Sequence, residues 1–169
     1  MIKQGFPPFV DKNTEIIIFG SLPGNISLKK HQYYGNPGND FWRLLGSAIS
    51  EDLQSMDYRS RLETLRSNGI GLWDVFKAGD RVGSGDAKIR DEEINQFSVL
   101  KEIVPKLRLI CFNGKKSGKY EPILREIGYE TKILPSSSGA NRRFLVKRES
   151  EWKDTFKIKK NYIEQSSIS

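Results

Sequence analysis

The chain has 169 residues, 37% of them apolar and 11% aromatic, which is enough for a hydrophobic core and argues against global disorder. Its 28 Lys and Arg outnumber 21 Asp and Glu, and a net charge of +7 favours a polyanionic partner, although any basic soluble protein would show the same surplus. The single cysteine, Cys111, excludes an intrachain disulfide and a cysteine-based zinc site.

The sequence alternates between strand-like and helix-like segments. In chain order it predicts an extended leader (1–14), a buried strand (16–19), a loop rich in Gly, Pro and Asn (20–38), a helix from 39 to about 49, a helix (58–67), a short strand or turn (69–76), a mobile loop (77–90), a helix (91–104), a strand (107–112), a helix (115–127), a strand (129–134), a Ser/Gly loop (135–142), a basic amphipathic helix (144–163) and a fraying tail (165–169).

Two patterns carry most of these predictions. Residues 16–19 are a continuous apolar run ended by Gly20, which is typical of a strand buried on both faces. Helical spacing of apolar residues follows Asn39, which we expect to cap the helix that it precedes. The apolar residues in this pattern are Phe41, Trp42, Leu45 and Ile49.

Strands alternating with helices predict an α/β fold with a mostly parallel sheet between helical layers. In such sheets the ligand site lies outside the carboxyl ends of the strands. Three suggestive segments follow predicted strands, and we expect them to converge on one cleft: 20–42, 113–116 and 135–143. No internal repeat is visible, so we expect a single domain over 1–169.

Several common sites are unsupported. The chain has no GxxxxGK[ST] phosphate loop, no GxGxxG after the first strand and no GxSxG elbow. The only histidine, His31, falls in an early loop, where a surface or DNA-backbone contact is more usual than a metal site, so we expect neither a Ser-His triad nor a metal. The apolar neighbours of Cys111 predict a buried, inert thiol. No apolar run approaches the ~20 residues of a membrane span.

The segment GSLPGNISLKKHQYYGNPGNDFW, residues 20–42, resembles the first motif of the uracil-DNA glycosylase superfamily. Its nearest likeness is the hypoxanthine-DNA (deoxyinosine) glycosylase branch. GIGLWDVF (69–76) is similar to the family's middle motif, and FNGK (112–115) resembles a strand end of the mismatch-specific branch. LPSSSGANRR (134–143) resembles the loop that penetrates DNA. The motifs are collinear over almost the whole chain.

The resemblance implies a three-layer α/β/α sandwich with a central, mostly parallel four-stranded sheet. It implies that Tyr34 stacks on a flipped base, whereas Tyr33 packs inward. Asn39 takes over catalysis, by positioning water or stabilising the charged sugar, because Leu22 stands where other branches carry a catalytic Asp or Asn. Asn113 hydrogen-bonds the excised base, since an amide offers both a donor and an acceptor. The base-binding set also includes Gly20, Ser21 and Leu22.

Plainer roles exist for the same residues. Asn39 could be only a helix cap, Asn113 a turn residue and Tyr34 a core tyrosine. Asp40 and Asp74 are the nearest carboxylates, and either could assist a water, but a first-turn charge for Asp40 and a loop cap for Asp74 account for them without a direct role. No lysine falls where a Schiff-base nucleophile is expected, so we do not expect strand cleavage.

DNA contacts are expected mainly from the loop of the last motif, through hydroxyls, backbone N–H groups and a wedge at its tip. The residues are Ser136, Ser137, Ser138, Gly139, Ala140, Asn141, Arg142 and Arg143. Basic residues outside the motif are further candidates for phosphate contacts, although each could be merely solvated. They are Lys29, Lys30, His31, Lys147 and Arg148.

The sequence therefore predicts a monofunctional glycosylase that hydrolyses the N-glycosidic bond of deaminated nucleotides, most of all deoxyinosine. The alternatives are a uracil- or mismatch-specific glycosylase (G:U, G:T) and a catalytically inactive DNA-binding module of the same fold. We expect a monomer without a cofactor, acting on DNA and not on a membrane, in the cytoplasm with the chromosomal DNA.

Overall fold

The structure, a computed structural model, describes residues 1–81 and 89–166, without the side chains of 81, 142–144 and 158–166. A four-stranded sheet lies at its centre, with every pair of neighbouring strands parallel and the order β3-β2-β6-β7. Its strands are β2 (Ile16–Gly20), β3 (Ile70–Asp74), β6 (Leu109–Asn113) and β7 (Glu130–Leu134). The mostly parallel four-stranded sheet predicted from the sequence is confirmed.

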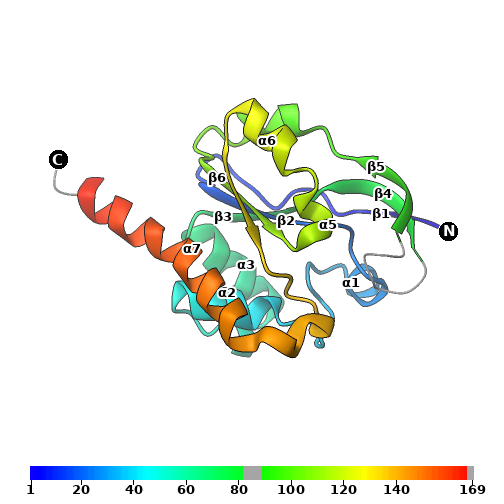
Figure 1. Ribbon diagram of the computed structural model, residues 1–169, viewed down its shortest axis with the longest axis horizontal. Coiled ribbons are helices and arrows are strands. Elements are labelled where there is room, and N and C mark those ends of the chain that lie inside the picture. Colours follow the sequence, from blue (N-terminus) through cyan, green and yellow to red (C-terminus); the bar gives the residue numbers. More distant parts are fainter. Residues whose placement is uncertain (82–88, 167–169) are drawn as a thin grey trace.

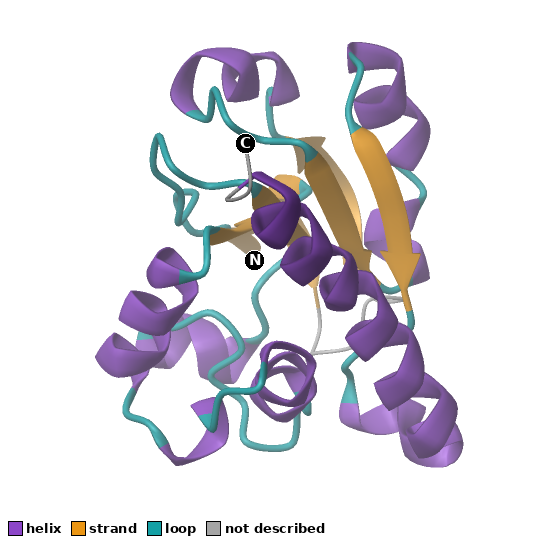
Figure 2. Cartoon of the chain, turned by 90° about the vertical axis from the view of Figure 1, so that its left-hand side faces the viewer, coloured by secondary structure: helices purple, strands orange, loops and turns teal. Residues whose placement is uncertain are grey.

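Helices cover both faces of this sheet, so the three-layer arrangement is confirmed as well (Figure 1). One face packs on α2 (Phe41–Ile49), α3 (Tyr58–Ser67) and α7 (Leu145–Ser166). The other packs on η3 (Phe97–Val99), α4 (Leu100–Ile103) and α6 (Glu121–Ile127). Figure 2 shows the strands flanked by helices when the molecule is turned by 90°.

A second, antiparallel sheet was not predicted. It has the order β1-β4-β5 and is formed by β1 (Ile2–Gln4), β4 (Phe76–Arg81) and β5 (Ile89–Ile94). The mobile loop predicted over 77–90 is therefore wrong at both ends, and its middle, 82–88, lies outside the described residues. The helix predicted over 91–104 is wrong in its first part, because strand pairing with β4 overrides the helix propensity of this charged segment, and helical structure begins only with η3 at Phe97 and continues through α4 to Ile103.

Smaller corrections concern helix boundaries. The loop predicted over 20–38 contains a short helix, α1 (Asn25–Lys30). The helix predicted over 115–127 is divided into α5 (Lys115–Gly118) and α6, because Pro122 fits only the first turn of a new helix. Helix α2 begins at Phe41, so Asp40 and not Asn39 holds the cap position. A short turn, η1 (Leu53–Ser55), links α2 and α3, and η4 (Gly139–Phe144) precedes α7.

Strand periodicity decides where the site forms. Side chains alternate between the two faces of a strand, and along β2 the residues Ile16 and Ile18 belong to the core under α2 and α7, whereas Ile17 and Phe19 face the opposite core. The same alternation at the last residues of β3, β2 and β6 puts three positions on the α2/α7 face at the carboxyl edge. They are Asp74, Gly20 and Asn113.

Among the described residues, none of the helices combines the length and the apolar character that crossing a membrane requires.

Candidate active-site cleft

A cleft of about 1030 Å³ opens at the carboxyl edge of the parallel sheet. This volume is in the range of sites that hold a small organic ligand. Residues from the three segments that were predicted to converge line it, together with Asp74 and the first turns of α7. The convergence follows from the parallel strands, whose carboxyl ends all meet at one edge.

Gly20 leaves an opening in the floor of the cleft, between Asp74 and Asn113. It pairs in register with Asp74 on the neighbouring strand. A Cβ atom on Gly20 would lie 2.6 Å from Asp74 Oδ1 and 3.0 Å from the Tyr34 hydroxyl oxygen. Any larger residue would therefore collide with the carboxylate and the phenol, and glycine is needed for both to lie over the strand end.

Tyr33 and Tyr34 have different surroundings, as the sequence predicted. Tyr33 is buried, and its hydroxyl donates to the carbonyl oxygen of Pro7 at 2.8 Å. Burial, and secondarily the negative charge of Asp74, raises the pKa of Tyr33 above its usual range, so this phenol stays neutral. Tyr34 is half-buried and stacks on Phe41, with ring centroids 3.6 Å apart and an interplanar angle of 7°. Phe41 covers one face of Tyr34, so a base could stack only on the other.

A buried serine joins the two asparagines of the predicted catalytic set. Ser137 is 0% exposed. Its hydroxyl accepts from Asn113 Nδ2 at 2.8 Å and donates to Asn39 Oδ1 at 2.8 Å, while its N–H donates to Asn113 Oδ1 at 2.8 Å. Asn113 Nδ2 also donates to the Tyr34 hydroxyl at 3.3 Å. Tyr34 and Asn39 from segment 20–42, and Asn113 from segment 113–116, thus belong to one hydrogen-bond network that Ser137 completes.

The network holds Asn39 by the oxygen of its side-chain amide, Oδ1. Asn39 Oδ1 also accepts from the N–H of Phe41 at 2.9 Å, so both of its lone pairs are engaged. The side chain therefore acts like a cap although it lies one residue before the cap position. Its Nδ2 group is what remains to meet a substrate.

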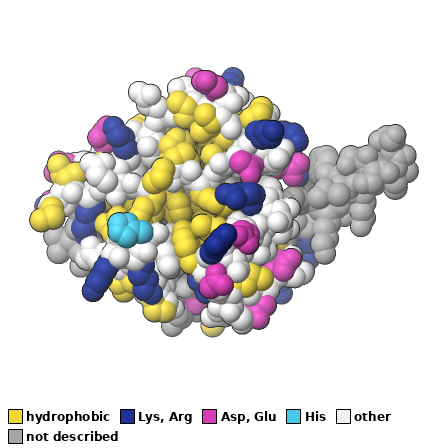
Figure 3. All heavy atoms as spheres, turned by 180° about the vertical axis from the view of Figure 1, so that it is seen from behind, with side chains coloured by type: hydrophobic (Ala, Val, Ile, Leu, Met, Phe, Trp, Pro, Cys, Tyr) yellow, Lys and Arg dark blue, Asp and Glu magenta, His cyan; other side chains and the backbone are white. Residues whose placement is uncertain are grey.

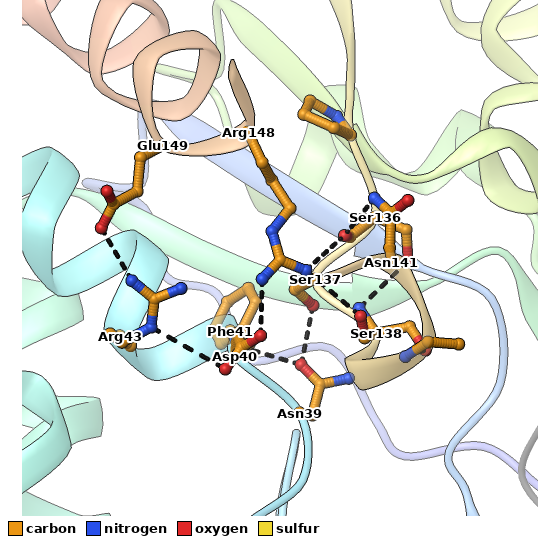
Figure 4. A network of polar contacts seen from close by, with 12 residues as sticks. Asn39, Asp40, Phe41, Arg43, Ser136, Ser137, Ser138, Asn141, Arg148 and Glu149 are labelled. Atoms are coloured by element: carbon orange, nitrogen blue, oxygen red, sulfur yellow. Dashed lines mark hydrogen bonds and ion pairs between the residues drawn. The ribbon is translucent and has the colours of Figure 1, made fainter. Parts of the chain in front are cut away.

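Arg148 ties the loop that carries Ser137 to the start of α2 (Figure 4). Its side chain is 0% exposed, and Nη2 donates to Asp40 Oδ2 at 2.5 Å. Nη1 donates to the carbonyl oxygens of Ser136 and Ser138 at 3.3 and 3.2 Å. The phosphate contact that we considered for Arg148 is therefore corrected: the guanidinium is an internal clamp. Asp40 likewise has a structural role in this clamp.

Other contacts also fix the loop at 135–141. Asn141 Nδ2 donates to the carbonyl oxygen of Ser136 at 3.0 Å, and Trp152 Nε1 donates to that of Pro135 at 2.9 Å. Ser137 is buried, so it connects the loop internally and does not offer its hydroxyl to a phosphate in this conformation. Ala140 is exposed at the tip. The side chains of Arg142 and Arg143, which we predicted to contact DNA, lie outside the described residues.

Leu22 and Ser21 have modest parts in the cleft. Both are buried and both line it. Leu22 packs into the core on the side of the sheet away from Tyr34, so an apolar residue suits this position. Within the part of the chain that the structure describes, no three His, Cys, Asp or Glu side chains gather where they could hold a metal ion.

Basic side chains surround the cleft. Lys115, Lys116 and Lys147 line it, although Lys116 pairs with Glu92 and Lys147 lies 3.8 Å from Glu151. Lys29, Lys30 and His31 are exposed at the end of α1. In Figure 3 the histidine has dark-blue basic side chains below it and a band of apolar surface beside it.

Sequence reasoning missed the clamp, although a signal for it existed. Arg148, Trp152 and Phe156 recur every four residues, and this spacing puts them on one face of a helix. Because the other two are buried apolar residues, the spacing also places the arginine inward. Nothing in the sequence indicates that its partner is Asp40, more than a hundred residues earlier.

Comparisons with known proteins agree with this geometry. The family model of the Uracil DNA glycosylase superfamily matches residues 7–158 of this chain. The chain belongs to this superfamily. A "Hypoxanthine DNA glycosylase" from Methanosarcina barkeri is 70% identical over 157 residues, which are 93% of this chain and 99% of the relative. One of the same name from Methanosarcina acetivorans is 69% identical over equal shares of both chains.

A solved structure of a superfamily member has the same fold. It is a solution NMR structure from Methanosarcina acetivorans, described there as a candidate uracil DNA glycosylase. It is 70% identical in sequence, covers 92% of this chain and 97% of its own, and superimposes with a TM-score of 0.86. The fold inferred from the resemblance of the motifs is thus confirmed.

Proposed function

We propose that this superfamily member is a monofunctional DNA glycosylase that releases hypoxanthine from DNA containing deoxyinosine. The names of its 70% and 69% identical relatives support the substrate. The observation that carries the proposal is the single network in which Tyr34, Asn113 and Asn39 meet in one cleft. A binding module without catalysis would have no need for this arrangement.

The target nucleotide has to leave the duplex before these groups can reach it. Flipping costs a few kcal/mol and costs least for mispaired or damaged bases, which include inosine opposite thymine. The flipped base would stack on the open face of Tyr34. The tyrosine backs onto Phe41, so the ring that receives the base is already immobilised.

Asn113 is the residue that would meet the base at the floor of the cleft. Its amide is only 9% exposed and already bonds to Ser137 and Tyr34. Base binding would exchange the 3.3 Å bond to the Tyr34 hydroxyl for a bond from Nδ2 to the carbonyl oxygen of the base. The donor is held in advance by Ser137, and preorganised donors stabilise the negative charge that develops on a departing base.

Asn39 would act through Nδ2. Cleavage breaks the bond between C1′ and the base nitrogen, and the base leaves with the electron pair. Water adds to C1′ and loses a proton, and the departing base gains one, so that the products are the C1′ hydroxyl and the neutral base. Because Oδ1 is fixed by Phe41 and Ser137, Nδ2 has one orientation and can hold this water by a lone pair of its oxygen. No step requires a lysine nucleophile, and therefore the product is an abasic site in an intact strand.

DNA phosphates would contact the rim. The proposed contacts are Ser136, Ser138 and the backbone of Gly139, Ala140 and Asn141, with Arg142 and Arg143 following in the chain. The exposed end of α1, with Lys29 and Lys30, is a second place where a backbone phosphate could bind.

Base release from defined duplexes tests the proposal. Duplexes with one deoxyinosine, or one deoxyuridine, are incubated with the protein in EDTA, and alkali then reveals abasic sites. We expect release at inosine, no strand cleavage before alkali, and loss of release in Asn39→Ala. Release at uracil alone would move the chain to the uracil-specific alternative, which the description of the NMR structure favours. Binding without release at either base would refute the proposal.

A further inference from the structure

Asp74 has no part in the proposed reaction, yet it lies in the cleft. It is the last residue of β3, is 5% exposed and lines the floor. A buried carboxylate costs several kcal/mol of desolvation that its polar neighbours have to offset, so an aspartate is an unusual residue for the end of a buried strand, where apolar residues are the rule. The neighbours of Asp74 along β3, Trp73 and Leu72, are such residues.

Three polar groups form a row above the strand ends. Asp74 Oδ1 and the Tyr34 hydroxyl lie 2.6 and 3.0 Å from the point where a Cβ of Gly20 would be. The Tyr34 hydroxyl is in turn 3.3 Å from Asn113 Nδ2. The row therefore presents an acceptor at β3 and a donor at β6, separated by two strand spacings or about 10 Å of backbone.

The carboxylate can accept from a ligand while it keeps its present neighbours. Each ionised carboxylate has about four lone-pair sites. The Asp74 backbone is held separately, by the bond that Asn95 Nδ2 donates to the Asp74 carbonyl oxygen at 2.8 Å. A substrate N–H at the side chain would therefore not compete with the contacts that hold β3 in place.

Deamination changes the edge of a base in the way that this row would detect. Adenine has a ring-nitrogen lone pair at N1, whereas hypoxanthine has an N–H there beside a new carbonyl oxygen. Cytosine and uracil differ in the same way at N3. A carboxylate accepts from the N–H and repels the lone pair, and an amide donor suits the carbonyl. Guanine and thymine carry such an N–H without damage, so their exclusion depends on their stable pairing and on the 2-amino group of guanine and the 5-methyl group of thymine.

We infer that Asp74 is a specificity-determining residue, whose carboxylate accepts the ring N–H created by deamination and so separates hypoxanthine from adenine and uracil from cytosine. This inference rests on the proposed glycosylase function. It assigns recognition of the ring nitrogen to β3 and leaves the carbonyl oxygen to Asn113. It requires that Asp74→Asn slows the release of bases that carry the ring N–H and does not slow the release of bases that have a lone pair at this position.

The test compares single-turnover rates of wild type and Asp74→Asn on deoxyinosine and on deoxynebularine. Nebularine is a purine with a lone pair at N1 and no oxygen at C6. We expect Asp74→Asn to lower the rate on inosine by about 10- to 100-fold, the value of one hydrogen bond to a charged group. The rate on nebularine should stay equal or rise, so that the inosine-to-nebularine ratio falls by at least the same factor. The matched control is Asp52→Asn, an exposed carboxylate outside the cleft.

The outcomes separate this inference from the proposed function. Wild type that releases no base would refute the proposed function, and the inference with it. Wild type that releases hypoxanthine, with equal loss on both substrates or no loss in Asp74→Asn, would overturn the inference alone. If Asp74→Asn does not fold by circular dichroism, wild type is compared on deoxyinosine and 1-methyldeoxyinosine, which lacks the N–H. A 10-fold or greater loss on the methylated base supports the inference, and equal rates overturn it.

Discussion

The two faces of the parallel sheet are formed by the same strands, but at the carboxyl edge they present different kinds of side chain. On one face, β2 and β6 end with Phe19 and Phe112, which stack with centroids 5.8 Å apart in a core that continues to the strand ends. On the other face, the next residues are Gly20 and Asn113, and the core gives way to the cleft. A step of one residue therefore separates a position in the core from a position that the proposed reaction would use, because strand side chains alternate.

The largest expected effects come from the two neighbours in β6, Phe112 and Asn113. Phe112→Ala empties a fully buried site and should lower the free energy of unfolding by about 3–5 kcal/mol, while folded protein at low temperature keeps its glycosylase rate. Asn113→Ala should lower the single-turnover rate on inosine by roughly 100-fold. It should cost only about 1–3 kcal/mol of stability, for the buried Ser137 N–H that loses its acceptor.

Urea denaturation and single-turnover assays at 15 °C measure both quantities for each variant. Ile123→Ala, at an apolar side chain that is 40% exposed on α6, is the matched control with little effect on either. The comparison of the faces breaks down if Phe112→Ala loses rate while folded, or if Asn113→Ala changes stability alone.

The clamp at the cleft gives the next largest effect. Arg148→Met leaves the Asp40 carboxylate buried without its main partner and frees two carbonyl oxygens, and we expect a loss of about 3–5 kcal/mol in the free energy of unfolding. Arg43 lies 3.8 Å from the same carboxylate but is one-third exposed, so Arg43→Met should cost about 0–1 kcal/mol.

Thermal and urea denaturation of both variants measure the difference. In the double variant Asp40→Asn, Arg148→Met the buried charge is absent, so part of the lost stability should return. Equal losses of stability in Arg148→Met and Arg43→Met would show that the clamp stabilises the fold no more than a surface ion pair does.

The location of the site at one edge of the parallel sheet could be predicted from the sequence. The clamp formed by Arg148 and the second sheet could not. The apolar runs of β2 and β6 indicate buried parallel strands. β7 was predicted although most of it is exposed, and β3 was predicted only as a short strand or turn. The motif residues Tyr34, Asn39 and Asn113 come from segments that such strands bring to one edge, so their convergence could be foreseen. The contacts between them could not, because the linking group is Ser137, a serine with the same apparent role in the sequence as its two neighbours.

The prediction for the β4–β5 region was wrong for a different reason. The sequence of β5 is IRDEEI, and only its first residue is buried. Periodicity cannot indicate a strand whose exposed residues are charged on both faces, and its strand conformation depends on pairing with β4. The exact start of a helix also depends on small local differences that the sequence does not reveal. The predicted cap of α2, Asn39, was one residue away from the observed cap, Asp40.

Tyr33 and Tyr34 offer a smaller test of the same contrast between fold and site. Tyr34→Leu removes the ring on which the base would stack and should weaken binding of an uncleavable 2′-fluorodeoxyinosine duplex by about 1–3 kcal/mol, or roughly 5- to 150-fold. Tyr33→Phe removes only a buried hydroxyl bonded to Pro7, so it should lower stability by about 1 kcal/mol without changing affinity. Fluorescence anisotropy measures the affinities, and a Tyr34→Leu variant that binds like wild type would contradict the stacking role.

The smallest expected effect locates the boundary between core and cleft on the site's own face. Cys111 lies two residues before Asn113 on that face but is fully buried, and burial raises the pKa of its thiol from 9.0 to about 12. The unfolded chain therefore loses this proton first, and stability that is complete below pH 9 falls as pH rises towards 12. Between pH 8 and 10 the loss from this group is about 1.4 kcal/mol. Urea denaturation at both pH values should show that loss in wild type beyond the loss in Cys111→Ala, since ionising tyrosines contribute equally to both proteins. Equal losses would mean that the thiol is open to solvent, and that the cleft extends one residue pair deeper along β6 than the packing shows.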